Sequence, residues 1–327
     1  MEVEKQMKTL VTGAAGFVGS NLCQKLLQEG HEVVGLDCFT DYYDTTLKRR
    51  NVELLDCTDF TLCEADINTA DLEQLVGAAD VVFHQAGQPG VRGSWGSQFS
   101  LYCDSNILAT QKLLEAAKKS KSLTRFVYAS SSSIYGNADR YPTSEVDLPA
   151  PLSPYGVSKL AGEHLCSLYA ENFGVPTVSL RYFTVYGPRQ RPDMAFTRFT
   201  KAAVTNTPIT LFGDGSQIRD FTFIDDIVNG NILAATATSI DAGVVYNLSG
   251  GSRVSVNEVL QILQELAVDD LIVKRQERFA GDVMQTGGTS EKAANEIGWS
   301  AEVSLEQGLA AQYEWAVQEF TSGPRSQ

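Results

Sequence analysis

A tyrosine and a lysine lie four residues apart in the segment Tyr155-Gly-Val-Ser-Lys159. On a helix this spacing puts the phenol and the ammonium one turn apart on the same face. A positive charge about 4 Å away, at an effective dielectric near 20, is worth about 4 kcal/mol. Allowing for solvent, we expect Lys159 to lower the pKa of Tyr155 by about one to three units from about 10. Such a phenol removes a proton from an alcohol while hydride leaves the carbon.

Four consecutive serines, Ser130 to Ser133, add weight to this pair. In a chain with 12 tyrosines the YxxxK spacing alone arises by chance at nearly even odds. The serines end the strand-like run that begins at Arg125, and a hydroxyl there can share the proton of a reacting oxygen. The alternative is a flexible serine loop, but such a loop seldom joins a buried strand directly to Ile134-Tyr135-Gly136.

A glycine triplet near the start of the chain predicts a dinucleotide site. Gly13, Gly16 and Gly19 (GxxGxxG) stand between a strand-like run and an amphipathic stretch. In that context phosphate approaches bare backbone and meets the positive end of the helix dipole. A simple tight turn is the alternative, and the flanking elements favour the binding site.

Asp37 closes the second strand about twenty residues after the triplet, where a carboxylate accepts both ribose hydroxyls of adenosine and repels a 2′-phosphate. Position 38 is Cys rather than Arg, so we expect NAD rather than NADP. An ordinary loop carboxylate is the alternative for Asp37. The Asp66-Ile67 pair follows the third strand, where it can contact adenine. The remaining expected cofactor contacts are Phe17, Val18 and Ala86.

The elements that must position these residues alternate along the first half of the chain. Strand-like runs cover Lys8–Thr12, Glu32–Leu36, Asp80–His84 and Arg125–Ser130, and the stretches 17–29 and 106–119 have helical spacing of apolar residues. Such alternation implies right-handed βαβ crossovers and a parallel sheet. The sequence therefore predicts a Rossmann-like, doubly wound α/β fold with a smaller mixed α/β substrate-binding domain.

Proline and glycine become frequent after the run Thr177–Phe183, which marks a less regular region with late helices at 256–266 and 305–320. We expect an NAD-binding domain from residues 1–180 plus about 222–250. Residues 181–221 and 251–320 are expected to form the nucleotide-sugar-binding domain. The last seven residues, 321–327, are expected to be a disordered tail.

Composition excludes several classes of protein. The 327 residues carry a formal net charge of −14, which opposes non-specific binding to nucleic acid or anionic membranes. No apolar run approaches the roughly 20 residues that cross a bilayer. Six cysteines without CxxC pairs and three histidines make a disulfide scaffold or a metal site improbable. We expect a cytoplasmic enzyme with no metal, no membrane segment and no nucleic-acid partner.

In the order of these motifs, the chain resembles the extended short-chain dehydrogenase/reductase family of nucleotide-sugar enzymes. The glycine triplet, Asp37, the serines before IYG, SPYGVSK and a later Arg-Asp-Phe follow the family pattern over nearly the whole length. The resemblance implies that Tyr155 is the base, that Lys159 positions the nicotinamide ribose and that Ser131 aids proton transfer. It also implies a bound NAD that oxidises a sugar carbon.

Three segments look like UDP-glucuronate 4-epimerases: Asp37–Asp44 with Leu47-Lys48, the QPGVR run, and RYFTVYGP followed by RPDM. UDP-glucose 4-epimerases usually carry Asn where this chain has Thr184. Oxidising C4 of a glucuronate makes a β-keto acid, so the enzyme must hold the carboxylate firmly and offer no acid. Hydroxyls of Ser132, Ser133 and Thr184 can hold it through charge-assisted hydrogen bonds, and Arg191 can add a positive lid or contact the diphosphate.

Related decarboxylases carry Glu at the position of Ser133, and 4,6-dehydratases carry Asp-Glu at Ser132-Ser133. A polar pocket for a neutral hexose remains the alternative for these serines. At the UDP end, the resemblance assigns Arg219 to a phosphate and Asp282 to a ribose, and Arg92 to the sugar or diphosphate. A surface ion pair or a structural role is the alternative for the two arginines.

The sequence therefore predicts a UDP-glucuronate 4-epimerase that uses tightly held NAD. The alternatives are a 4-epimerase for UDP-glucose or UDP-N-acetylglucosamine, a UDP-glucuronate decarboxylase, and a non-catalytic NAD-binding regulator, since fold alone does not fix activity. Helices near 106–119 and 156–171 form the dimer interface in relatives, so a homodimer is expected.

Overall fold

The structure is a computed structural model that describes residues 6–277 and 285–321. Its strands are β1 (Lys8–Thr12), β2 (Glu32–Asp37), β3 (Phe60–Glu64), β4 (Val81–His84), β5 (Arg125–Ser131), β6 (Thr177–Tyr182), β7 (Thr184–Tyr186), β8 (Ile209–Phe212), β9 (Ile218–Phe223), β10 (Val244–Leu248), β11 (Ser252–Ser255) and β12 (Val273–Gln276). Its α-helices are α1 (Phe17–Gln28), α2 (Thr45–Glu53), α3 (Leu72–Gly77), α4 (Phe99–Tyr102), α5 (Ala109–Lys119), α6 (Pro154–Phe173), α7 (Ala195–Val204), α8 (Ile224–Thr236), α9 (Val256–Leu266), α10 (Glu291–Ile297) and α11 (Leu305–Thr321).

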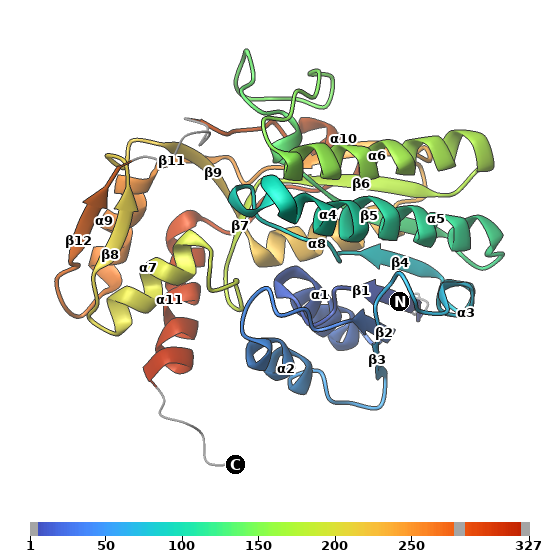
Figure 1. The fold of residues 1–327 in the computed structure, drawn as a ribbon, viewed down its shortest axis with the longest axis horizontal. Helices are drawn as coiled ribbons and strands as arrows, with labels where there is room; N and C mark the ends of the chain where they lie inside the picture. The colour runs from blue at the N-terminus through green and yellow to red at the C-terminus, as the bar shows by residue number, and fades with distance from the viewer. Residues whose placement is uncertain (1–5, 278–284, 322–327) are drawn as a thin grey trace.

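Within the described residues, seven strands form one sheet in the order β10-β6-β5-β4-β1-β2-β3 (Figure 1). Every neighbouring pair in this sheet is parallel. The order reverses between β1 and β4, which is the point where doubly wound sheets bind ligands at the carboxyl ends of their strands. The predicted Rossmann-like fold is confirmed.

The core has two layers because alternate strand residues face opposite sides of the sheet. Val11, Phe83 and Val127 belong to one buried cluster, which also contains Leu22 and Leu26 of α1 and residues of α8. Leu10, Val82 and Phe126 belong to the other, with side chains of α3, α5 and α6. Both faces are therefore covered, which is why these strands read as continuous apolar runs.

A second region lies beside the main sheet, on the left in Figure 1. It contains the sheet β11-β9-β7, the pair β12-β8, and the helices α7, α9 and α11. The main sheet takes strands from residues 8–182 and from β10 at 244–248. The domain bounds 1–180 with about 222–250, and 181–221 with 251–320, remain a prediction.

Helix ends follow the sequence closely, with one exception. The predicted helix at 256–266 is α9, whose N-cap Ser255 forms a capping box with Glu258. Helix α11 extends one residue beyond the predicted end, to Thr321, so the expected tail begins no earlier than 322 and lies outside the described residues. The helix predicted from Asn106 instead begins at Phe99, because α4 runs through a π-helical segment (Cys103–Leu108) into α5.

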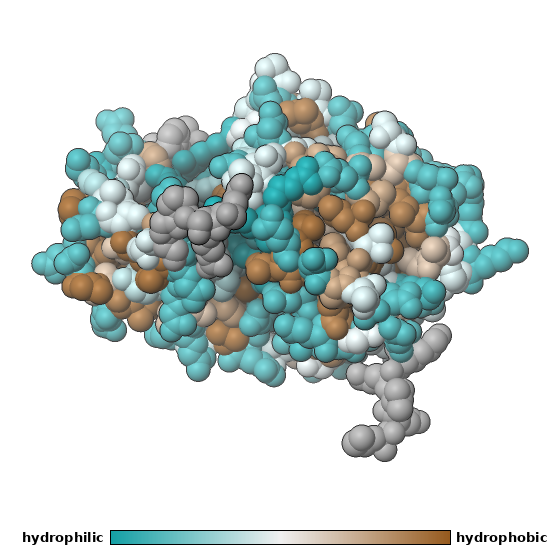
Figure 2. Space-filling model, turned by 90° about the horizontal axis from the view of Figure 1, so that it is seen from below, coloured by the Kyte–Doolittle hydropathy of each residue, from teal (hydrophilic) through white to brown (hydrophobic). Residues whose placement is uncertain are grey.

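Viewed from below, the molecule exposes mostly hydrophilic residues, with hydrophobic residues in separate patches between them (Figure 2). No helix in the described part of the chain has both the length and the apolar character needed to cross a membrane.

Candidate active site

A cavity of about 440 Å³ opens at the carboxyl ends of β1, β4, β5 and β6. It lies where the strand order reverses, as expected for this architecture. Most of the residues predicted for the site line it together: Gly13, Gly16, Phe17, Val18, Gly19, Asp37, Asp66, Ile67, Ala86, Ser131, Ser132, Ser133, Tyr155, Lys159, Thr184 and Arg191.

The glycine turn between β1 and α1 leaves no room for side chains. Gly13 has φ +70°, and a Cβ there would lie 2.8 Å from the backbone nitrogen of Ala86. A Cβ on Gly19 would lie 2.1 Å from the carbonyl oxygen of Gly13. Gly16 is the N-cap of α1 and supplies no side-chain hydrogen bond, so first-turn N–H groups of the helix remain for an anion. This bare cradle fits the diphosphate of a dinucleotide.

Asp37 ends β2 at the cavity wall. Its two carboxylate oxygens accept hydrogen bonds from the backbone N–H groups of Ala15 (3.1 Å) and Phe39 (2.8 Å). These bonds fix the carboxylate beside the glycine turn, where an adenosine ribose would lie.

Lys48 is a residue of this wall that sequence reasoning did not assign to the cofactor. Its side chain is buried, and its Nζ donates to the carbonyl oxygen (2.9 Å) and Oγ1 (3.0 Å) of Thr40. The ammonium lies 5.0 Å from the Tyr43 ring centroid. Burial lowers the pKa of Lys48, while the carboxylate of Asp37 opposes that shift. No spacing rule marks a lysine eleven residues after Asp37, and only the fold of the intervening loop brings the two together.

The tyrosine and lysine lie on the first turns of α6, whose start is set by Ser153 and by proline at its first position. The Ser153 Oγ accepts a hydrogen bond from the Gly156 N–H at 3.1 Å. Lys159 is buried, and its Nζ lies 4.7 Å from the Tyr128 ring centroid. Burial lowers the pKa of Lys159 to about 8.

The pKa of Tyr155 differs from the sequence expectation. Desolvation raises it, and the two influences that oppose the rise are a hydrogen bond with Ser131 and the positive charge of Arg191. The prediction that Lys159 lowers this pKa toward neutrality is therefore wrong. The physical reason is that the desolvation cost on a phenol in a protein wall exceeds the help that its neighbours give.

The serines turn away from β5 into a short 3-10 segment (Ser132–Ile134), which brings them around the cavity floor. The Ser131 Oγ also accepts a hydrogen bond from the Ser133 N–H at 3.1 Å. Thr184, the first residue of β7, lines the same cavity. The hydroxyls predicted to hold the sugar carboxylate, those of Ser132, Ser133 and Thr184, therefore line the same cavity as Tyr155.

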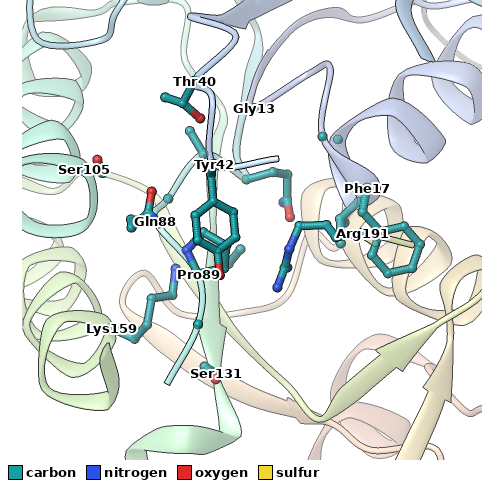
Figure 3. Close-up of a pocket in the computed structure, with 18 of the residues that line it drawn as sticks. Gly13, Phe17, Thr40, Tyr42, Gln88, Pro89, Ser105, Ser131, Lys159 and Arg191 are labelled. Atoms are coloured by element: carbon teal, nitrogen blue, oxygen red, sulfur yellow. The ribbon is translucent and has the colours of Figure 1, made fainter. Parts of the chain in front are cut away.

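Arg191 enters from the loop between β7 and α7, and its guanidinium bonds both oxygens of Asp193 at 3.0 Å. Figure 3 shows Arg191 and Lys159 on opposite sides of the cavity, with the Tyr42 ring between them in that view. The Arg191 Cζ lies 6.0 Å from the Tyr42 ring centroid. Asp193 therefore holds the cation at the wall of the cavity.

Two predicted substrate residues, Arg92 and Arg219, are not among the described residues that line the cavity. Arg92 has its Cζ 5.1 Å from the Phe212 ring centroid, and Arg219 donates to the carbonyl oxygen of Ile218 at 2.9 Å. Asp282 lies outside the described residues. The assignment of these three residues to the substrate remains a prediction.

Asn106 is a second residue that sequence reasoning missed. Its side chain accepts from the Gln88 N–H (2.7 Å) and donates to the Gln88 carbonyl oxygen (3.1 Å) and to Ser158 Oγ (2.9 Å). It therefore ties the loop that follows β4, which lines the cavity, to α6. The sequence shows helical spacing at Asn106 but gives no sign of the wider π-helical turn; such turns are frequent at functional sites.

Comparison with known proteins adds independent information. The sequence model of the NAD dependent epimerase/dehydratase family matches residues 9–249. A Bacillus subtilis protein named an uncharacterized UDP-glucose epimerase, YtcB, is 44% identical over 305 residues, which cover 93% of this chain and 96% of the relative. A UDP-glucuronate 4-epimerase of Thermodesulfobacterium geofontis is 38% identical over 94% of this chain and 95% of its own length.

The chain is also similar to a solved structure over nearly its whole length. The crystal structure of UDP-glucuronic acid 4-epimerase from Bacillus cereus, in complex with UDP-glucuronic acid and NAD, matches with a TM-score of 0.91. The two sequences are 45% identical, and the match covers 95% of this chain and 99% of that one.

Proposed function

The chain belongs to the NAD dependent epimerase/dehydratase family, and from that premise we propose that it is a UDP-glucuronate 4-epimerase. It interconverts UDP-glucuronate and UDP-galacturonate by inverting C4 of the sugar. The observation that carries the proposal is a cavity that is lined together by the Tyr155–Lys159 pair, the hydroxyl groups of Ser132, Ser133 and Thr184, and the partly buried guanidinium of Arg191.

Bound NAD would supply a reversible acceptor for the C4 hydride. Tyr155 takes the proton of the C4 hydroxyl as the hydride leaves, and it gives the proton back when the ketone, turned to present its other face, is reduced again; Ser131, its hydrogen-bond partner, holds the same oxygen. Lys159 stabilises the phenolate with its positive charge and holds the nicotinamide ribose. Gly13, Asp37 and the N-terminus of α1 hold the diphosphate and adenosine. The roles of Asp66, Ile67 and Ala86 in cofactor contact belong to the same proposal.

The acidic arm of the sugar must stay fixed because the 4-keto intermediate is a β-keto acid. It loses CO2 readily when its carboxylate turns perpendicular to the ketone. Ser132, Ser133, Thr184 and Arg191 supply hydrogen bonds to this carboxylate, each worth about 1.5–3 kcal/mol. Among the described residues that line the cavity, the carboxylates are Asp37 and Asp66, at the adenosine end. No acid there is placed to protonate an enolate at the sugar end.

The second region binds UDP in this proposal. Arg219 pairs with a phosphate, Asp282 binds the uridine ribose, and Arg92 approaches the diphosphate or sugar. The guanidinium geometry of the two arginines suits phosphate oxygens.

The working unit is proposed to be a homodimer. Apolar side chains stand exposed along α4, the π-helical segment and α6, with Leu101 47%, Leu108 42%, Val157 46% and Leu168 52% exposed. These elements run side by side in front of the sheet (Figure 1), and a second copy would cover them. A cytoplasmic location is also proposed, because the six cysteines are all free, as in a reducing compartment.

The test is incubation of the purified protein with UDP-glucuronate, UDP-glucose and UDP-N-acetylglucosamine separately, with products identified by NMR. We expect UDP-galacturonate from the first substrate and much slower change in the other two. UDP-pentose with CO2 as the main product would instead make the protein a decarboxylase. Preferential turnover of UDP-glucose would reassign the serines to a neutral hexose.

A further inference from the structure

A buried ion pair lies directly behind the catalytic face of α6. The Arg181 Nη2 and Nε bond the two carboxylate oxygens of Glu163 at 2.6 and 3.1 Å. Their side chains are 5% and 4% exposed. Removing two charges from water costs several kcal/mol per ion. Stability alone therefore explains such a pair poorly, and its position suggests a further role.

Glu163 connects the elements that carry the reacting groups. It lies one helical turn after Lys159 and two after Tyr155 on α6. Its Oε2 accepts a hydrogen bond from Ser130 Oγ at 2.6 Å, next to Ser131 at the end of β5. The Glu163 carboxylate therefore links α6, the helix that carries Tyr155, to β5, the strand that ends at Ser131.

Arg181 extends the connection to the other wall of the cavity. It lies on β6, three residues before Thr184. Its Nη1 donates to the Tyr135 hydroxyl at 2.6 Å, which donates to Asn247 Oδ1 at 2.7 Å. The network therefore reaches the segment after the serines and β10.

We propose that Glu163 is a positioning residue for C4 epimerisation. Its carboxylate holds the Tyr155–Lys159 face of α6 in register with Ser131, and it supplies the buried negative charge that keeps the Lys159 ammonium protonated. The assignment rests on the proposed function, since it gives Tyr155 and Lys159 their roles in proton transfer.

The surroundings of the Lys159 ammonium explain why this charge matters. A Cβ on Gly87 would lie 3.7 Å from Nζ, so the amine sits against the loop after β4. The titratable groups around it are His84 of β4, Tyr128 of β5, and Glu163 and Cys166 of α6, and the Arg181 guanidinium of β6 is paired with Glu163.

At neutral pH most of these groups carry no charge. Burial lowers the pKa of His84 to about 3 and raises the pKa of the Tyr128 phenol and the Cys166 thiol. Desolvation also keeps Tyr155 protonated until substrate arrives. The groups that oppose the desolvation of Lys159 are Cys166 and Glu163; because burial keeps the Cys166 thiol protonated, the carboxylate of Glu163 is the one that carries a charge at neutral pH.

The test compares Glu163→Gln with Glu163→Gln/Arg181→Met. The single variant leaves a buried guanidinium unpaired and can fail to fold; the double variant removes both charges and avoids that cost. In each NAD-loaded protein, the Lys159 titration is followed by NMR of lysines labelled at 13Cε, assigned with Lys159→Met. The kcat is measured against pH on whichever UDP-sugar the wild type turns over. Glu29→Gln, in the exposed pair with Lys25, is the matched control.

We expect Glu163→Gln, where it folds, to titrate Lys159 below the wild type and to move the basic limb of kcat to lower pH. The double variant loses both charges, so its Lys159 titration should change less, but its kcat should fall because Ser130 loses the carboxylate that ties β5 to α6. The control should titrate like the wild type. A double variant with the wild-type titration and kcat profile would make the ion pair purely structural and overturn the proposal. Because the titration needs no turnover, it answers this question even if UDP-glucuronate is not the substrate.

Discussion

Replacing Arg191 by methionine tests whether the cavity recognises the carboxylate of the sugar. The guanidinium is held over the cavity by Asp193, and its side chain is 19% exposed. One charge-assisted hydrogen bond to a carboxylate is worth about 1.5–3 kcal/mol. Its loss should lower kcat/KM for UDP-glucuronate by about 10- to 150-fold. UDP and UDP-glucose lack this carboxylate, so their affinities should change little.

The assay combines calorimetry with UDP, UDP-glucose and UDP-glucuronate, and NMR identification of products. Asp193→Asn is the matched control, because it keeps the guanidinium and removes only its partner. Arg191→Met should also release more CO2, since the carboxylate of the 4-keto intermediate can turn more freely. An equal loss of affinity for all three ligands would show that Arg191 binds the diphosphate and would refute the reasoning.

Three further predictions follow from the site and its surroundings. Tyr155→Phe should abolish turnover while NAD stays bound, measured as nucleotide released on denaturation; unchanged activity would remove Tyr155 as the base. Ser133→Glu should place an acid at the sugar end and raise the share of UDP-pentose, detected by NMR; a product ratio like that of the wild type would show that a carboxylate at this position cannot reach the enolate. His84, which bonds Thr12 and Thr110, has its pKa lowered by burial to about 3 from the usual 6.5, so its contribution to stability is complete above pH 6.5 and is lost as pH falls toward 3. In denaturant unfolding, the contribution of His84 to the free energy of unfolding should be about 2 kcal/mol smaller at pH 5 than at pH 7. The His84→Gln protein should lack this loss of stability between pH 7 and pH 5. An identical dependence of stability on pH in both proteins would contradict the prediction.

Much of the fold could be predicted because the local patterns and the packing agree. Val82 and Phe83 face opposite layers, yet both are apolar, which is the signature of a strand buried on both sides. The end of α1 is also local, since Gly30 has φ +81° just beyond the helix. The start of the long helix, which lies before Asn106, is not determined by the local sequence. Its first turns, from Phe99, are fixed by contacts such as the Tyr102 hydroxyl on the carbonyls of Pro89 and Gly90.

The site also contains residues whose place follows from the local sequence and residues whose place does not. Gly13 and Asp37 stand at fixed offsets from a strand, so their place in the cavity follows from the sequence. Lys48 lies on α2, behind the loop that follows Asp37, and Arg191 lies on a loop whose path depends on contacts far along the chain. Gln190, for example, bonds Thr197 and Gln312 and so fixes the loop that carries Arg191. No short spacing encodes such a contact.

The tuning of Tyr155 shows why a two-residue motif is insufficient to establish its chemistry. The spacing YxxxK supplies a cation one turn away, but burial of both groups raises the pKa of the phenol and lowers that of Lys159 to about 8. The lysine helps the phenolate only while it is charged, and near neutral pH that charge depends on what faces it. Cys166 and Glu163, further along the same helix, are the groups that oppose the desolvation of Lys159. In the proposed mechanism the chemistry therefore rests on three residues at successive turns, Tyr155, Lys159 and Glu163, with Glu163 acting from behind the cavity wall.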